Sequence, residues 1–195
     1  VATACAQRLW DGSPSARADR TVVILGEEYP GDPAGVASLL LNPVTLHPGE
    51  AMYIPVGTVH AYLSGMAVEV MAASDNELRG GLTTKPVDVA GLLECMDRVA
   101  APPLRIAPEL FWGSSKVFYA PVDDFELSVT SVDDGGSHPL PGRGPRIVLC
   151  LDGLVALNAA SGTLTLARGQ SAFVSAADGP LTMVGSGTLV QADVP

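Results

Sequence analysis

The pattern of apolar and polar positions changes character twice along the chain. From residue 1 to about residue 41 the apolar positions follow helical spacing, with a break at Ser13 and Pro14. This spacing predicts two short helices. A turn cluster, Tyr-Pro-Gly-Asp-Pro at 29–33, then precedes one further helical turn at 36–40.

The pattern from residue 42 to residue 73 is typical of β-strands. Apolar residues gather in three short runs that are separated by glycine-containing turns, which predicts antiparallel strands at 44–46, 51–54 and 68–71. A helix is predicted next, from Asp88 to Val99. Asp88 is a suitable N-cap for this helix, and the apolar residues that follow it are spaced as one buried stripe: Val89, Leu92, Leu93, Met96 and Val99.

Prolines at 102, 103 and 108 interrupt the pattern, and the rest of the chain has strand character. Strands are predicted at 116–120, 125–132, 146–151, 154–158, 163–167, 171–174, 181–184 and 188–192. Short, evenly spaced strands of this kind are typical of a sandwich or a jelly roll. The predicted regions are therefore the end of a helical region at 1–41, a β domain with a closing helix at 42–100, a linker at 101–112 and a second β domain at 113–195.

Composition narrows the choice of partner. A formal net charge of −10, with only 11 Lys and Arg in 195 residues, argues against a nucleic-acid partner. No apolar run approaches the roughly 18 residues that a membrane helix needs, so we expect no membrane partner. The three cysteines, Cys5, Cys95 and Cys150, are interpreted as reduced core thiols of a cytoplasmic protein. The first residue is Val rather than Met, which is consistent with a sequence that begins within a longer protein.

The most specific segment for chemistry is GEAMYIPVGTVHAYLSG, residues 49–65. It fits the second motif of the cupin proteins through Gly49, Pro55, Gly57 and His60, with Ser64 where Asn is usual. In this interpretation the turn at Pro55 and Gly57 starts a return strand, so that the imidazole of His60 points into a barrel and can bind a metal ion.

Further segments in the same order extend this similarity. EVMAASDN at 69–76 and LRGGLTTK at 78–85, together with residues 27–55, 144–153 and 167–180, resemble the type I mannose-6-phosphate isomerases over nearly the whole chain. The resemblance implies a mainly β fold with short helices, in which the C-terminal half of a cupin-type jelly roll, the catalytic domain, precedes a second small β jelly-roll domain. It also implies that mannose 6-phosphate and fructose 6-phosphate interconvert through a zinc-assisted cis-enediol.

The resemblance also assigns residue roles. In the family Gln, His, Glu and a later His hold zinc, and only the last of these has a match here, at His60. Because a zinc site needs about four ligands, His60 alone cannot form one, and we expect no catalytic zinc unless the other ligands are supplied. Arg79 matches the active-site arginine, and Lys85 matches a lysine associated with the substrate phosphate. Glu69 is a candidate for proton transfer, with a structural hydrogen bond to the neighbouring strand as the alternative. Tyr62 is a candidate for sugar contact, with a hydroxyl bonded within the core as the alternative.

Several departures from the family pattern leave the activity open. Glu77, Pro86 and Met66 replace residues of other types, and the charge of Glu77 close to Arg79 could weaken phosphate binding. The alternative is a non-catalytic module that binds a sugar phosphate and has lost its metal ion. A different metal-dependent cupin, such as an oxygenase, is disfavoured because a His-x-His motif is missing. The expected partner is a small sugar phosphate, and no oligomeric state is predicted.

Overall fold

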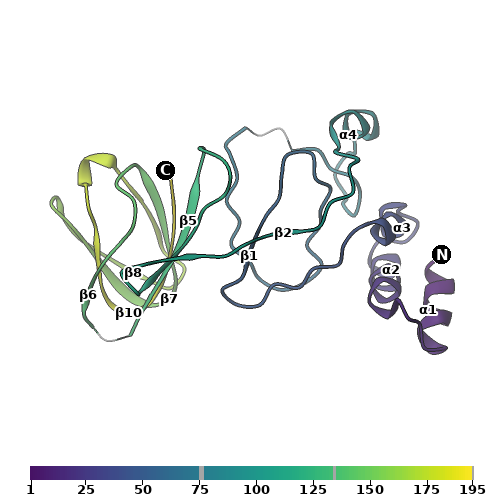
Figure 1. Ribbon diagram of the computed structural model, residues 1–195, viewed down its shortest axis with the longest axis horizontal. Helices are drawn as coiled ribbons and strands as arrows, with labels where there is room; N and C mark the ends of the chain where they lie inside the picture. Colours follow the sequence, from purple (N-terminus) through teal and green to yellow (C-terminus); the bar gives the residue numbers. More distant parts are fainter. Residues whose placement is uncertain (75–76, 134, 195) are drawn as a thin grey trace. The chain divides into compact units, whose positions relative to one another are not determined.

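The protein is described by a computed structural model, which covers residues 1–74, 77–133 and 135–194. The chain divides into two compact units (Figure 1). The first unit contains Val1–Met66 and Ser74–Leu104, and the second contains Ala67–Ala73 and the chain from Arg105 onward. Residues 67–73, which the sequence pattern groups with the preceding strands, therefore belong to the second unit. Two short strands, β2 (Leu104–Ile106) and β3 (Glu109–Phe111), lie within the range predicted as a linker.

The first unit begins with the helices that the spacing predicts. These are α1 (Ala2–Trp10), α2 (Ala16–Glu28), α3 (Ala34–Ala37) and the 3-10 turn η1 (Ser38–Leu40), and the break between α1 and α2 falls at the predicted position. Within the described part of the chain, none of the helices is both long enough and apolar enough to span a bilayer.

A buried carboxylate fastens α1 to α2. The guanidinium of Arg8 pairs with Asp19, with its Nε 3.1 Å from Asp19 Oδ2, and the Ser13 hydroxyl donates to the same oxygen at 2.6 Å. These hydrogen bonds hold the pKa of Asp19 well below its usual range. Because this pKa is lowered, the stabilisation is complete above the ordinary carboxyl pKa and is lost on acidification below it.

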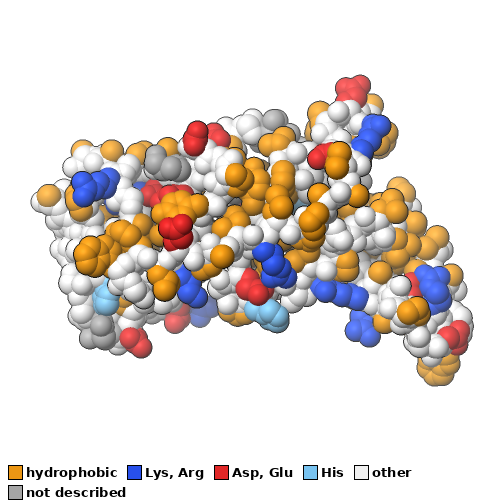
Figure 2. All heavy atoms as spheres, in the orientation of Figure 1, with side chains coloured by type: hydrophobic (Ala, Val, Ile, Leu, Met, Phe, Trp, Pro, Cys, Tyr) orange, Lys and Arg blue, Asp and Glu red, His pale blue; other side chains and the backbone are white. Residues whose placement is uncertain are grey.

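The remainder of the first unit is open. None of its described residues from 36 onward, which are 36–66, 74 and 77–104, is buried, and many large apolar side chains on this stretch are exposed (Figure 2). Of the three predicted strands only β1 (Ala51–Tyr53) forms, so the prediction of strands at 44–46 and 68–71 is wrong. A strand is stable only when a neighbour completes its ladder and covers one face, and the described residues give these two segments no such neighbour.

The helix after this stretch is shorter and more exposed than its pattern predicts. α4 spans Val89–Cys95, and the predicted N-cap is confirmed because the side chain of Asp88 accepts a hydrogen bond from the Gly91 amide at 3.0 Å. The predicted buried stripe is wrong, since Val89 and Leu93 are about half exposed and Val99 lies beyond the helix. Cys95 is exposed and not a core thiol, whereas Cys5 and Cys150 are buried as expected. An apolar stripe becomes buried only where another element covers it.

The second unit is an antiparallel β structure. Its further strands are β4 (Ser115–Phe118), β5 (Glu126–Val132), β6 (Ser137–Pro139), β7 (Arg146–Ala159), β8 (Gly162–Ala167), β9 (Ser171–Val174) and β10 (Thr182–Asp193). The sheet order is β3-β4-β5-β10-β7-β8, with β6 paired to β10 and β9 paired to β7. The expectation of a mainly β chain is confirmed.

The longest strand contains a bulge where the sequence pattern predicts a turn. Asp152 pairs with Thr188 and Cys150 pairs with Leu189, so that Leu151 is an extra residue in β7. The buried positions accordingly change parity, from 146, 148 and 150 before the bulge to 155 and 157 after it. A bulge bends a strand without ending it, so the predicted strand pairs at 146–158 and 181–192 are each one continuous strand.

The interior of this β structure has an apolar part and a polar part. The hydrophobic core gathers residues such as Val148, Cys150, Val155, Met183 and Leu189, which are almost fully buried. Polar side chains are buried at the end of the same face where β5, β10 and β7 lie side by side: Glu126, Ser128, Arg146, Gln191 and Asp193. The core of the chain therefore lies mainly in the second unit.

Candidate functional site

The turn that precedes His60 is fixed to the end of α4. The Thr58 amide donates to Pro55 O at 3.1 Å, and the Gly57 carbonyl accepts from the Asp97 amide at 2.9 Å. Gly57 has φ +81°, and a Cβ on it would lie 2.8 Å from Cys95 O. Only glycine meets both requirements, which explains why this residue type occurs at this point of the motif.

His60 and Tyr62 lie together immediately after this turn. The Nδ1 atom of His60 is 3.0 Å from Thr58 O, and the two rings pack edge to face with their centroids 6.0 Å apart. Both side chains are exposed, and the predicted return strand that begins at His60 does not form. The prediction of an inward-pointing imidazole on a strand is therefore wrong for the chain in this form, because the strand lacks a ladder partner among the described residues.

The segment that carries Arg79 and Lys85 is held in place by Asp32. The carboxylate of Asp32 accepts from the amides of Ala34 and Leu82, each at 2.8 Å. Gly81, at φ +139°, makes this approach possible, because a Cβ there would lie 2.6 Å from Ala34 Cβ. Asp32 thus connects the turn before α3 to the backbone of the loop 79–85, whose two basic side chains are partly or fully exposed.

Asp32 was not identified as a site residue from the sequence. Its signal was present, since the turn cluster at 29–33 contains an Asp whose side chain can accept backbone amides, but the amide of Leu82 lies 50 positions away and cannot be inferred from a local pattern. We interpret Asp32 as a positioning residue for the loop 79–85.

Replacing Asp32 by alanine should loosen the loop 79–85. The change removes the acceptor of two amides and should cost about 1–2 kcal/mol of local stability, so that the Leu82 amide exchanges with solvent about tenfold faster. Hydrogen exchange measured by mass spectrometry checks this. Asp97→Ala is the matched control, because Asp97 also accepts a nearby amide, that of Val99, but does not contact the loop. Equal exchange at Leu82 in both variants would contradict the positioning role.

The predicted site residues do not all lie in the same unit. His60, Tyr62, Arg79 and Lys85 belong to the first unit, whereas Glu69 lies in the segment Ala67–Ala73 of the second. Met66, Glu77 and Pro86, the positions that depart from the family pattern, are exposed. The described residues therefore bring an imidazole and a phenol together and present two basic side chains on one anchored loop.

The first unit does not supply a complete set of metal ligands. Among the described residues, no group of three or more His, Cys, Asp or Glu side chains is arranged to hold a metal ion. A zinc ion needs three or four such donors at about 2.0–2.3 Å. The residues present therefore do not fit a zinc ion by themselves, and His60 could act only as one ligand among others.

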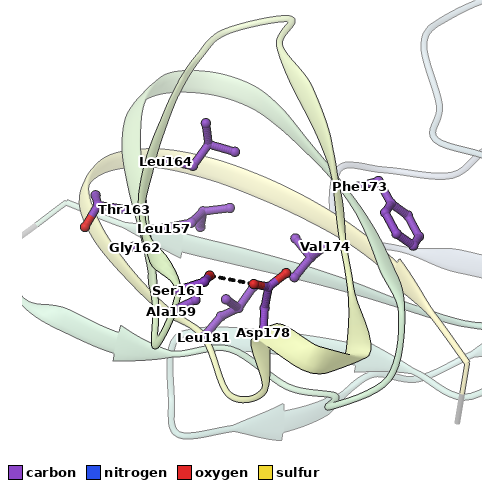
Figure 3. A pocket seen from close by; sticks show the side chains of 10 residues that line it. All are labelled: Leu157, Ala159, Ser161, Gly162, Thr163, Leu164, Phe173, Val174, Asp178 and Leu181. Carbon is purple, nitrogen blue, oxygen red and sulfur yellow. Dashed lines mark hydrogen bonds between the residues drawn. The ribbon is translucent and has the colours of Figure 1, made fainter.

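A pocket of about 260 Å³ opens in the second unit, and none of the predicted site residues lines it (Figure 3). Its floor is apolar, with Leu157, Leu164 and Leu181 directed toward it. The Ser161 hydroxyl donates to Asp178 at 2.5 Å on its rim. The Asp178 carboxylate also accepts from the Ser175 amide at 3.1 Å, and the lining contains no His, Lys or Arg, so we interpret the Ser161–Asp178 pair as structural and not as catalytic.

Comparisons with known proteins point to one family. Residues 114–194 match the model of the mannose-6-phosphate isomerase cupin domain. The mannose-6-phosphate isomerase of Escherichia coli (strain K12) is 38% identical over 173 residues, which cover 88% of this chain and 44% of the relative. The rat enzyme, from Rattus norvegicus, is 37% identical over 162 residues, or 78% of this chain and 38% of the relative.

Solved structures agree with the sequence comparison. The mannose 6-phosphate isomerase of Salmonella typhimurium, bound to fructose 6-phosphate and zinc, aligns with a TM-score of 0.80 at 32% identity. This alignment covers 99% of this chain and 49% of that one. The apo form of the same enzyme gives a TM-score of 0.80 as well. The chain thus spans about half the length of the relatives it matches.

Proposed function

Because the chain belongs to the mannose-6-phosphate isomerase family, we propose that it contributes part of the active site of an aldose-ketose isomerase acting on a sugar phosphate. The reaction proposed is the interconversion of mannose 6-phosphate and fructose 6-phosphate. The chain covers 44% of the Escherichia coli relative, so this activity requires the part of the fold that the chain does not match.

The first unit supports this proposal through the way it anchors its candidate residues. The turn before His60 is bonded to Asp97, and the loop with Arg79 and Lys85 is bonded to Asp32, although no described residue of this stretch is buried. Backbone bonds of this kind fix a loop without a core. This anchoring is the observation on which the proposal rests.

The proposed roles follow from the chemistry of each side chain. Arg79 would stabilise the enediolate or the phosphate through its planar fork of donors, and Lys85 would hold the phosphate as a point charge. Glu69 would move the proton between C2 and C1, and Tyr62 would bind sugar hydroxyls. Isomerisation through a cis-enediol needs both a base beside the carbon and positive charge near the oxygens.

Zinc enters the proposal only through His60. We propose that this imidazole is one of the metal ligands and that the remaining ligands come from the unmatched part of the fold. The structure of the Salmonella typhimurium relative contains zinc and fructose 6-phosphate, which supports a metal in the assembled site. The donors among the described residues do not hold zinc by themselves, so the roles proposed for this chain rest on its own side chains and not on a metal ion.

Reconstitution tests the proposal. The chain is combined with the N-terminal part of the Escherichia coli enzyme that it does not match, and isomerisation, zinc content and complex formation are measured. We expect the combination, and not the chain alone, to bind about one zinc and to interconvert the two sugar phosphates. His60→Ala should abolish zinc binding, whereas His47→Ala, at an exposed histidine of the same unit, should not.

The reconstitution experiment also distinguishes the isomerase from the alternative function. A complex that forms but shows neither zinc nor isomerisation would favour a non-catalytic module that binds a sugar phosphate, which the incomplete donor set of the described residues supports. Such a module should bind fructose 6-phosphate in the presence of a chelator, with affinity that Lys85→Ala weakens.

A further inference from the structure

Three charged side chains form one row across the interior of the second unit. Asp193 of β10 is directly opposite Glu126 of β5 on one side and Arg146 of β7 on the other. Residues opposite each other in antiparallel strands point to the same face, so the three side chains are neighbours. Their exposed fractions are 7% for Glu126, 1% for Arg146 and 4% for Asp193.

Backbone carbonyls close the end of the β structure over this row. Arg146 donates to Gly142 O at 2.9 Å and also to Gly179 O, and Gln191 donates to Pro141 O at 2.8 Å. Gly142, at φ +74°, packs so closely that a Cβ there would overlap Asp193 Oδ2. The two terminal nitrogens of the Arg146 guanidinium thus donate to carbonyl oxygens and not to the carboxylates, which leaves the carboxylates poorly compensated.

The polar atoms left over are mostly acceptors. Among the described residues, neither carboxylate oxygen of Asp193 has a hydrogen-bond partner, nor does Gln191 Oε1. The donors left over next to them are Arg146 Nε and the hydroxyl of Ser128, which is opposite Gln191. The row also contains two carboxylates and one guanidinium. A buried and uncompensated carboxylate is costly, and it is relieved when the group takes up a proton.

We propose that this row binds one proton that Glu126 and Asp193 hold in common, and that this proton keeps the end of β10 in register between β5 and β7. The proton supplies the missing donor and removes the excess negative charge. The row belongs to the second unit alone, and its proton does not depend on the proposed isomerase function.

The surroundings of both carboxylates favour the proton. Burial raises the pKa of Glu126, and the charge of Asp193 raises it further. Burial also raises the pKa of Asp193. The nearby amide group of Gln191 and the positive charge of Arg146 act in the opposite direction and lower it. The other charged or titratable groups around the row are Asp178, which acts on Arg146, and Tyr119 with its neighbour Glu109.

The sign of the pH effect follows from these raised pKa values. The folded row binds the proton more tightly than the unfolded chain does, so its stabilisation is complete below the ordinary carboxyl pKa of about 4. It is lost as the pH rises through the raised value. The end of β10 should therefore open more often at higher pH, while the Asp19 cluster of the first unit weakens at lower pH.

Hydrogen exchange on the full chain tests the proposal. Protection factors of amides at the end of β10 are measured from about pH 5 to about pH 9. A protection factor compares the observed exchange rate with the intrinsic one, so the intrinsic pH dependence of exchange is removed. The equilibrium constant for opening the end of β10 should increase by up to about tenfold per pH unit over the pH range in which the proton is lost. Glu126→Gln should remove this dependence, because Asp193 and Arg146 then balance. Asp124→Asn, at an exposed carboxylate two residues before Glu126, should retain it.

A second measurement guards against a variant that fails to fold. Carbon NMR of the side-chain carboxyl groups in the unmodified chain should show one of the pair, Glu126 or Asp193, still protonated above the pH range in which exposed carboxyls titrate. Ordinary titration of both groups would overturn the proposal, and so would a Glu126→Gln variant whose β10 amides keep the pH dependence of the unmodified chain.

Discussion

Replacing Arg79 by alanine in the reconstituted enzyme should lower kcat/KM by about 10²- to 10³-fold, the usual cost of removing one donor that stabilises a developing oxyanion. The reason is that a guanidinium offers a fixed pair of donors at a full positive charge, which no water molecule replaces in a closed site. Steady-state kinetics with mannose 6-phosphate measure the effect. The loop itself should keep its place, because Asp32 binds its backbone and not the Arg79 side chain.

The distribution of the loss between kcat and KM identifies the group that Arg79 contacts. A fall in kcat at constant KM would indicate the enediolate, whereas a rise in KM alone would indicate the phosphate. Arg79→Lys keeps the charge without the fork and should recover part of the activity. Arg98→Ala is the control, because Arg98 is an exposed arginine of the same unit that donates to Leu93 O. An Arg79→Ala enzyme as active as this control would exclude an active-site role.

Replacing Gly153 by alanine should destabilise the second unit by roughly 2–4 kcal/mol, which for a domain of this size corresponds to about 10–20 °C in Tm. Gly153 has φ +79°, and a Cβ there would overlap the carbonyl oxygen of Ser186 on β10. The alanine therefore forces the central strands apart at the bulge. Thermal unfolding followed by near-ultraviolet circular dichroism or calorimetry measures the change.

Gly169→Ala separates the two contributions to this cost. Gly169 has a similar φ, +84°, but a Cβ there meets nothing within 4 Å. It should therefore cost only the backbone part, about 1–2 kcal/mol. If Gly153→Ala lowered the stability no more than Gly169→Ala does, the close approach of β7 and β10 at the bulge would be contradicted.

The bulge also explains where prediction from the sequence failed. Asp-Gly at 152–153 is a common hairpin turn, and nothing local distinguishes it from a bulge glycine. The outcome depends on β10, whose residues Gly185 and Gly187 leave room for the backbone of β7 to approach. The same contact keeps β10 continuous where two strands were predicted.

Local features were correctly predicted because their causes are local. The cap at Asp88 depends on an amide three residues away, and the helices of residues 1–41 depend on spacing within one turn. The ordered motifs from residue 49 to residue 85 indicated the family, which the comparisons confirmed. By contrast, the sequence could not show that the apolar stripe of α4 is left open, since burial depends on whichever element covers it.

The sequence by itself determined the helices of residues 1–41 and most strands of the second unit, since these depend on neighbours close in the chain, and its motifs indicated the family and predicted the candidate residues. Only the tertiary structure decided that Asp32 holds the loop with Arg79, and that Glu126, Asp193 and Arg146 share one buried row. These contacts join residues from 47 to 67 positions apart, and their energy depends on burial and register, which no local pattern encodes.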